Sequence, residues 1–298
     1  MPLRLRGIIP AVLTPYTPGG DVNEAELRAH LDFLIDGGVH ALFPVGTTGE
    51  GPLLKSELRK RVAQVCVDHV AGRVPVMVHT GAASTAETVE LSRHAAAIGA
   101  DAVSVVTPYY YIYDMDSLFG HYTAVAHSVP ELPVVLYNNP SKANNTISPE
   151  LFARLRETCS NVIGVKDTSG SVQNLQEYIA AVDDEAVVLT GSNTLILACL
   201  AVGAVGAIST VANCFPEIMV EMYEAFIGGD LATARRKQQL VHGIWRAFNL
   251  GQWPGIQKLG LQLRGRSFSR RVTPPLREPT RVEEEMLRAA LSELGVLN

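Results

Sequence analysis

Hydrophobic and polar positions follow two patterns that recur in turn along the chain. Short, almost continuous apolar runs rich in β-branched residues are each followed by a longer segment in which apolar residues recur with helical spacing. The apolar runs are typical of strands that are buried on both faces. We predict strands at residues 7–13, 41–45, 74–78, 102–106, 134–137, 162–165, 187–189 and 205–208.

The segments between these runs predict helices at residues 24–36, 55–71, 85–98, 115–128, 149–158, 172–182 and 193–202. Some begin after a capping residue, such as Asn23 or Ser148. Repeated alternation of strand and helix indicates an α/β protein with a (β/α)8 TIM barrel. An open doubly wound sheet would carry a G-x-G-x-x-G turn after its first strand, which this sequence lacks.

The strand pattern stops near residue 215. Residues 216–227, 231–248, 254–264 and 282–294 have helical spacing without intervening apolar runs. We therefore expect a catalytic barrel over residues 1–228 and a C-terminal helical domain over residues 229–298. Residues 265–279 are basic and contain prolines, and are predicted to form a solvated loop.

Composition narrows the functional classes. Of 298 residues, 47% are hydrophobic, and the formal net charge is −5, which excludes a disordered chain and argues against nucleic acid as a partner. Four widely spaced cysteines do not form a zinc or disulfide framework and suit a reducing compartment. We expect a cytoplasmic protein, because the N-terminus lacks a signal-peptide pattern and the longest apolar run is too short for a membrane span.

Polar and glycine-rich motifs follow nearly every predicted strand, at the barrel face where active sites form. Loops are polar in general, but that tendency does not account for a lysine and two tyrosine-bearing strand ends among so few residues. The motifs are GTTGE at 46–50, His79 with its neighbours, TPYY at 107–110, YNNP at 137–140, KDTSG at 166–170 and GSN at 191–193.

Lys166 is the sharpest candidate, because it ends an apolar strand at 162–165. Partial burial disfavours its charged form and lowers its pKa, and a neutral amine can attack a ketone or aldehyde to form a Schiff base. The plainer interpretation is a lysine that reaches solvent or pairs with a carboxylate. Asp167 is a poor partner, since neighbouring strand residues point to opposite faces.

Schiff-base chemistry also requires a group that moves protons. Tyr137 ends the preceding strand and could relay protons with Thr47 or Thr48 and a tyrosine of TPYY; alternatively, it is an aromatic plug of the barrel. The GTTGE segment, with Gly46 and Gly49, offers backbone N–H groups for a carboxylate or phosphate, or is only a structural turn.

Metal and cofactor chemistry finds little support in the sequence. The eight histidines form no H-E-x-x-H motif, and no Walker A loop is present. We therefore expect amine catalysis with no metal and no cofactor, acting on a small anionic substrate.

Four motifs carry a family resemblance. In order and spacing, GTTGE at 46–50, the tyrosine pair at 109–110, LYNNP ending at Pro140 and VIGVKDTSG ending at Gly170 resemble the dihydrodipicolinate synthase / N-acetylneuraminate lyase family. The resemblance covers nearly the whole chain. It implies a (β/α)8 barrel with a C-terminal helical domain, a Schiff-base-forming pyruvate aldolase, lyase or dehydratase, and a homotetramer built as a dimer of dimers.

The resemblance also implies catalytic roles. Lys166 matches the Schiff-base lysine, and Tyr137 matches the tyrosine that shuttles protons and contacts the substrate carboxylate. Thr47 matches the relay threonine. Tyr110 matches the tyrosine that a neighbouring subunit contributes across the tight dimer.

Other positions match the binding pocket of pyruvate or another 2-oxo acid. Thr48 corresponds to a carboxylate-binding threonine beside Gly46 and Gly49 of the turn. The backbones of Gly191 and Ile208 match positions that line the pocket.

Two departures from the family pattern bear on the second substrate. Lys142 stands where synthases of the lysine pathway typically have an arginine, and lysine lacks the bidentate fork that binds carboxylates. His79 replaces a small residue and would bring a polar ring near the pocket.

These departures lead us to favour an aldolase or dehydratase of 2-keto-3-deoxy sugar acids or related hydroxy-oxo acids. The alternative is 4-hydroxy-tetrahydrodipicolinate synthase, which joins pyruvate to aspartate semialdehyde. A third hypothesis is a non-catalytic 2-oxo-acid-binding protein, although binding alone does not require the proton relay.

Overall fold

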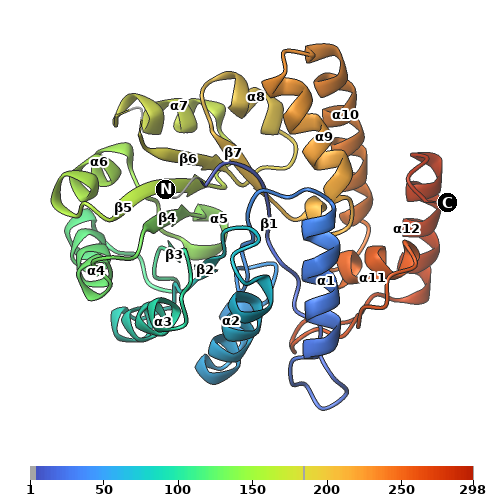
Figure 1. The fold of residues 1–298 in the computed structure, drawn as a ribbon, viewed down its shortest axis with the longest axis horizontal. Coiled ribbons are helices and arrows are strands. Elements are labelled where there is room, and N and C mark those ends of the chain that lie inside the picture. The colour runs from blue at the N-terminus through green and yellow to red at the C-terminus, as the bar shows by residue number, and fades with distance from the viewer. Residues whose placement is uncertain (1–4, 184, 298) are drawn as a thin grey trace.

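The fold is a curled parallel sheet surrounded by helices (Figure 1). The computed structural model describes residues 5–183 and 185–297, and within these ranges seven strands form one sheet in the order β1-β7-β6-β5-β4-β3-β2. The strands are β1 (Gly7–Pro10), β2 (Met77–His79), β3 (Ala102–Val106), β4 (Val134–Asn138), β5 (Val162–Asp167), β6 (Val187–Thr190) and β7 (Gly206–Ser209). This parallel, neighbour-to-neighbour order confirms the predicted α/β class and barrel type of fold.

The prediction of a strand at residues 41–45 is wrong, because this segment forms only isolated bridges. Leu42 and Phe43 make only isolated parallel bridges, to Val76 beside β2 and to Ala11 beside β1. Extended pairing ends there because Pro44 has no N–H to donate and Val45 has a left-handed φ of 61°. The two edges of the sheet are thus joined through this segment by single bridges rather than by an eighth strand.

All eleven predicted helices are present, several with the predicted bounds. The helices are α1 (Glu24–Asp36), α2 (Ser56–Val70), α3 (Thr85–Ala97), α4 (Met115–Ser128), α5 (Pro140–Ala143), α6 (Pro149–Thr158), α7 (Val172–Ala180), α8 (Ile196–Ala201), α9 (Pro216–Ile227), α10 (Leu231–Phe248), α11 (Gly255–Leu263) and α12 (Arg281–Glu293). Two 3-10 turns, η1 (Gly51–Leu53) and η2 (Val211–Asn213), and the short α5 were not predicted.

Strand alternation separates two apolar layers, and this separation decides what faces the barrel interior. On β4, Val134 and Leu136 belong to the core between sheet and helices, whereas Val135 and Tyr137 belong to the inner cluster. Because successive side chains point to opposite faces, this register directs the Tyr137 ring into the barrel.

The last helices, α10, α11 and α12, lie along one side of the barrel, coloured orange to red in Figure 1. A third apolar cluster joins them to the strands, since it contains Ile8 of β1 and Ala207 of β7 together with Phe248 of α10 and Leu287 of α12. The boundary between residues 228 and 229 stays a prediction, but the C-terminal helices share a core with the barrel.

The segment at residues 265–279 is a loop, as predicted, and most of its residues are exposed or half-buried, but several contacts anchor it to the protein. Phe268 is only 3% exposed, the Ser269 N–H donates to Glu26 of α1, and the Arg271 carbonyl accepts from Lys258 of α11. The buried Phe268 ring and these hydrogen bonds hold the segment against α1 and α11. The basic composition of the segment gives no sign of these contacts.

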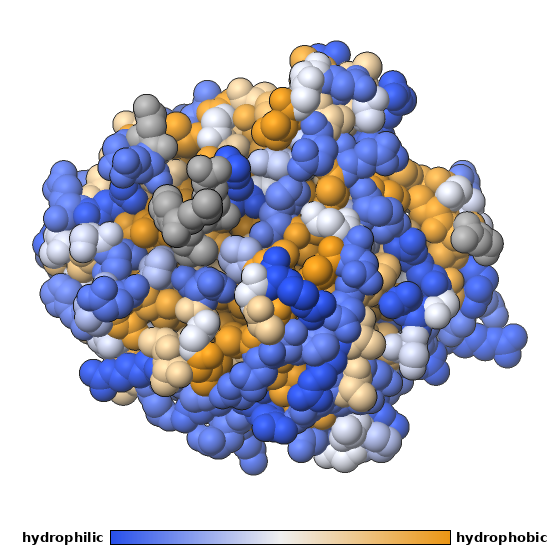
Figure 2. Space-filling view, in the orientation of Figure 1, coloured by the Kyte–Doolittle hydropathy of each residue, from blue (hydrophilic) through white to orange (hydrophobic). Residues whose placement is uncertain are grey.

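The surface seen in Figure 2 is covered mostly by hydrophilic residues, with hydrophobic residues showing between them. This fits helices that turn one apolar face toward the sheet and a polar face outward. Among the residues that the structure describes, no helix has both the length and the apolar composition to cross a bilayer.

Candidate active site

A cavity of about 350 Å³ lies at the carboxyl ends of the strands and collects most of the predicted site residues. Strand ends, the GTTGE turn, α5 and the C-terminal helices all contribute to its wall. The predicted residues that line it are Thr47, Thr48, Tyr137, Lys142, Lys166, Gly191 and Ile208.

Lys166 lies near the end of β5, in register with Tyr137 of β4 and Leu189 of β6. Its side chain is almost fully buried, and its Nζ lies 3.8 Å from the centroid of the Tyr137 ring and 4.4 Å from that of Phe43. Burial lowers the pKa of Lys166, an effect that Tyr137 partly offsets. A larger fraction of this amine is therefore neutral than in an exposed lysine.

Asp167 does not neutralise Lys166. Its carboxylate accepts hydrogen bonds from Asn138 Nδ2 at 2.7 Å and from Ser169 Oγ at 2.6 Å. The carboxylate is thus engaged with neighbours of its own, as the alternation of side chains along the strand predicts.

The Tyr137 hydroxyl is held by two polar side chains. It shares a hydrogen bond with Thr47 Oγ1 at 3.3 Å and accepts one from Asn139 Nδ2 at 2.9 Å. Burial alone would raise the pKa of Tyr137, but the charge of Lys166 and hydrogen bonds from neighbouring side chains lower it below its usual value. A phenol that gives up its proton more readily, beside an amine, is suited to proton transfer.

The glycines of the GTTGE turn serve packing. A Cβ on Gly46 would lie 2.5 Å from Phe43 Cε1, and one on Gly49 would lie 2.8 Å from the Val12 carbonyl oxygen. Neither glycine lines the cavity, whereas Thr48 does and is 2% exposed. The turn therefore presents its two threonines to the cavity, while its glycines allow it to pack closely on the barrel.

Gly191 follows β6, at a place with no room for a side chain. A Cβ there would lie 2.2 Å from Thr168 Oγ1 and 3.1 Å from Lys166 Cε. The absence of a side chain is what allows the lysine to extend into the cavity.

We expect Gly191→Ala to displace Lys166 and Thr168 and to lower kcat/KM for the protein's reaction about 10- to 100-fold, because small shifts of reacting groups are costly. Overpacking should also lower the free energy of unfolding by about 1–3 kcal/mol. Steady-state kinetics and urea unfolding measure both effects. Gly120→Ala in α4 is the control, since a Cβ there meets nothing within 4 Å. Equal kinetics of the two variants would contradict a steric role for Gly191.

Besides Gly46 and Gly49, two more predicted residues, His79 and Tyr110, lie outside the cavity wall. His79 is buried, with its ring edge-on to those of Phe43 and Tyr137 at 5.8 Å each and its Nδ1 3.5 Å from Arg59 Nη2. Burial, reinforced by the charges of Arg59 and Lys166, holds the pKa of His79 well below its usual value. His79 is therefore a neutral ring that supports Tyr137 from behind, rather than a group that lines the cavity.

Tyr110 is the other of these two residues outside the cavity wall. It is 80% exposed, has a φ of 91° and packs against Tyr111 in the loop after β3. Within one chain, Tyr110 does not reach the residues around Lys166.

Several cavity residues were not singled out from the sequence. Some belong to strand-end motifs whose importance the sequence did indicate, among them Asn139, Thr168 and Asn193. No sequence signal links the C-terminal helical region to the site, so its contributions were unforeseen. These contributions are Trp245, Asn249 and Trp253.

The described parts of the chain contain no group of three or more histidine, cysteine or acidic side chains arranged to hold a metal ion. The chemical groups at the cavity are instead a buried amine, a phenol with a lowered pKa, hydroxyls, amides and one further cation, Lys142.

Comparisons with known proteins agree along the whole chain. The sequence model of the dihydrodipicolinate synthetase family matches residues 4–294. A 4-hydroxy-tetrahydrodipicolinate synthase of Methanopyrus kandleri is 40% identical over 298 residues, covering 100% of this chain and 99% of that protein. An uncharacterized DapA-like lyase of Halobacterium salinarum is 40% identical over 300 residues, covering 99% and 96%.

Solved structures show the same similarity. YagE of E. coli K12, a prophage protein of the dihydrodipicolinic acid synthase family solved in complex with pyruvate, is similar with a TM-score of 0.95. It is 36% identical, and the match covers 98% of this chain and 99% of YagE. The 4-hydroxy-tetrahydrodipicolinate synthase of Methylacidiphilum fumariolicum is 30% identical with a TM-score of 0.93, covering 98% and 96%.

Proposed function

The chain belongs to the dihydrodipicolinate synthetase family, and from that premise we propose that it is a lyase in which Lys166 forms a Schiff base with pyruvate or another 2-oxo acid. The observation that carries this proposal is a buried lysine with a lowered pKa at the wall of a cavity, beside the Tyr137 ring. The structural relative solved with pyruvate supports the choice of substrate.

In the proposed reaction, the neutral amine of Lys166 attacks the carbonyl carbon of the 2-oxo acid, and water leaves to form the imine. The protonated imine then makes the neighbouring carbon acidic, so that loss of a proton gives an enamine that attacks the second substrate; in the reverse direction, cleavage of the carbon–carbon bond leaves the same enamine, which is protonated. Hydrolysis of the imine releases the product and returns the Lys166 amine. Tyr137 donates and accepts the protons of these steps, and Thr47 relays them through the 3.3 Å hydrogen bond. Thr48 and the GTTGE backbone bind the carboxylate.

Tyr110 enters this scheme only from a second copy of the chain. It is exposed, together with Tyr111 and Ile112, at 80%, 66% and 83%. Three exposed apolar residues in a row are typical of a covered surface. We infer that a homo-oligomer, such as a dimer of dimers, covers this loop and completes the relay.

Two hypotheses remain for the second substrate. The names of relatives at 40% and 39% identity support 4-hydroxy-tetrahydrodipicolinate synthase activity, with aspartate semialdehyde as the partner of pyruvate. Lys142 favours the other reaction, because a single ammonium cannot bind a carboxylate in two parallel hydrogen bonds. Amide and hydroxyl side chains that line the same cavity suit the hydroxyls of a 2-keto-3-deoxy sugar acid; they are Ser141, Asn193, Thr210 and Asn249. Steady-state turnover of one substrate set and not the other decides between them.

Incubation with pyruvate and borohydride should add a reduced imine to Lys166, which mass spectrometry of the digested protein locates. The rate of trapping should rise with pH, because only the deprotonated amine is nucleophilic. Its midpoint should lie below 10.5, the ordinary lysine value, since burial lowers the pKa of Lys166. The exposed lysine at position 55 is the internal control for non-specific labelling. An unmodified Lys166 would refute the Schiff-base proposal.

A further inference from the structure

We propose that Glu50, Lys258 and residues 268–280 form a clamp by which the C-terminal helices position the GTTGE turn. The clamp itself is a claim about structure, and its effect on catalysis rests on the proposed function. Glu50 and Lys258 are then positioning residues, which act through Thr47 and Thr48.

The GTTGE turn is held in a backbone conformation that it would not keep unaided. Val45 before it and Glu50 at its end have φ values of 61° and 64°, although neither is glycine. Such conformations persist only where the surroundings over-determine them. Gly51 next to the turn has no space for a side chain, since a Cβ would lie 1.9 Å from the Val45 carbonyl oxygen.

The Glu50 carboxylate connects the turn to two distant segments. Its side chain and that of Lys258 in α11 are both 0% exposed, and Oε1 lies 2.6 Å from Lys258 Nζ. Its Oε2 accepts a hydrogen bond of 2.6 Å from the Thr273 N–H. A paired charge in a buried site is costly to displace, because a lone buried partner would remain.

Lys258 is itself held from several sides. Its Nζ donates to the Arg271 carbonyl at 2.5 Å and lies 4.4 Å from the centroid of the Tyr16 ring. Burial lowers the pKa of Lys258, and Glu50 opposes that shift. Two backbone groups of the same loop thus contact the ion pair: the Arg271 carbonyl accepts from Lys258, and the Thr273 N–H donates to Glu50.

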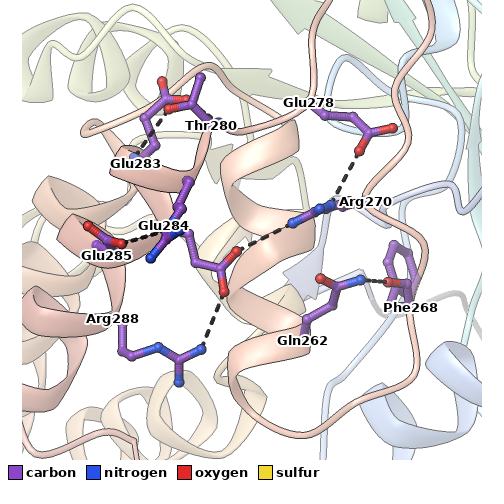
Figure 3. A network of polar contacts seen from close by, with 10 residues as sticks. Gln262, Phe268, Arg270, Glu278, Thr280, Glu283, Glu284, Glu285 and Arg288 are labelled. Atoms are coloured by element: carbon purple, nitrogen blue, oxygen red, sulfur yellow. Dashed lines mark hydrogen bonds and ion pairs between the residues drawn. The ribbon is translucent and has the colours of Figure 1, made fainter.

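The first part of this loop is fastened to α11 and α12, as Figure 3 shows. Gln262 of α11 donates to the Phe268 carbonyl at 2.8 Å. Arg270 pairs with Glu278 at 3.3 Å and with Glu284 of α12 at 3.4 Å. Exposed ion pairs are individually weak, but together with the Gln262 hydrogen bond they tie residues 268–270 to α11 and α12, directly before residues 271–273.

The clamp holds the turn that carries Thr47 and Thr48, the residues proposed to relay protons and to bind the carboxylate. The turn is also tied to the barrel by Thr14 Oγ1, which donates to the Gly49 carbonyl at 2.9 Å. Both contacts hold the carboxyl end of the turn, at Gly49 and Glu50, and Thr47 in the same turn lies within hydrogen-bonding distance of Tyr137. Loss of the clamp should therefore affect proton transfer and carboxylate binding while leaving Lys166 in place.

The test compares Lys258→Met and the double variant Glu50→Gln/Lys258→Met with the wild type. Each is assayed at a temperature at which circular dichroism shows it folded. The double variant leaves no unpaired buried charge, so it controls for misfolding. Lys237→Met, which removes a surface pair with Glu221 at 2.5 Å, is the matched control.

In both clamp variants we expect the rate of pyruvate trapping and the rate of substrate turnover each to fall about 10- to 100-fold, since small displacements of catalytic groups have effects of this size. Amide hydrogen exchange at residues 46–51 should be faster than in the wild type. Lys237→Met should match the wild type in both measurements.

A double variant with wild-type rates and wild-type exchange would overturn the clamp. Failure of the proposed function is seen separately: in that case, pyruvate and borohydride do not label Lys166 of the wild-type protein. In that case amide exchange alone decides, and unchanged protection at residues 46–51 overturns the clamp.

Discussion

Replacing Lys166 by methionine is expected to abolish turnover, lowering kcat by about 10⁴-fold or more, as loss of a covalent nucleophile does. Methionine keeps an unbranched apolar stem against the rings of Phe43 and Tyr137, so the fold should survive. The variant has no amine to form an imine and should not be labelled by pyruvate and borohydride. Steady-state kinetics, mass spectrometry and circular dichroism together measure the three outcomes.

Lys142→Met is the matched control, because it removes a second amine from the same cavity wall. It should still trap pyruvate at Lys166, while the KM of the second substrate rises. If the Lys166 variant kept measurable turnover through another amine, or if only Lys142→Met abolished labelling, the assignment of the nucleophile would be wrong.

Tyr137→Phe is expected to lower kcat by about 10²- to 10⁴-fold, the usual contribution of a general acid or base. The change removes the hydroxyl that links Thr47 and Asn139 but leaves the ring over the Lys166 amine. Substrate binding should change less than kcat, because the hydroxyl acts mainly in proton transfer. Pre-steady-state trapping should show slower imine formation at the same final extent.

Tyr223→Phe provides the control for loss of a tyrosine hydroxyl, since its hydroxyl contacts the Val205 carbonyl and does not line the cavity. It should keep wild-type kinetics. A Tyr137→Phe variant with normal kcat and a raised KM alone would show that the hydroxyl binds substrate without moving protons.

The residues at the strand ends could be brought together from the sequence, because parallel strands deliver their carboxyl ends to one face. This reasoning placed Lys166, Tyr137 and Thr47 in one site, and the structure gathers all three around one cavity. It failed at residues 41–45, where an apolar run predicts a strand but Pro44 and the left-handed Val45 allow only isolated bridges.

Long-range contacts explain the remaining differences. His79 stands at a strand end like the cavity residues, yet its buried ring packs edge-on against those of Phe43 and Tyr137 and does not line the cavity. Residues 265–279 look solvated by composition, yet Phe268 is buried and Thr273 binds a carboxylate more than 200 positions earlier. Composition and periodicity carry no information about partners so far apart.

The sequence by itself determined the alternation of strands and helices, the buried strand that desolvates Lys166, and the motifs that carry the family resemblance. These are local properties, set by hydrophobic spacing and by residue types at strand ends. Only the tertiary structure decided that α10 contributes to the cavity wall and α11 to the clamp, that Tyr110 does not line the cavity of its own chain, and that Glu50 is paired with Lys258. Such pairings depend on how distant segments pack, and packing is set by the whole fold rather than by any one stretch of the chain.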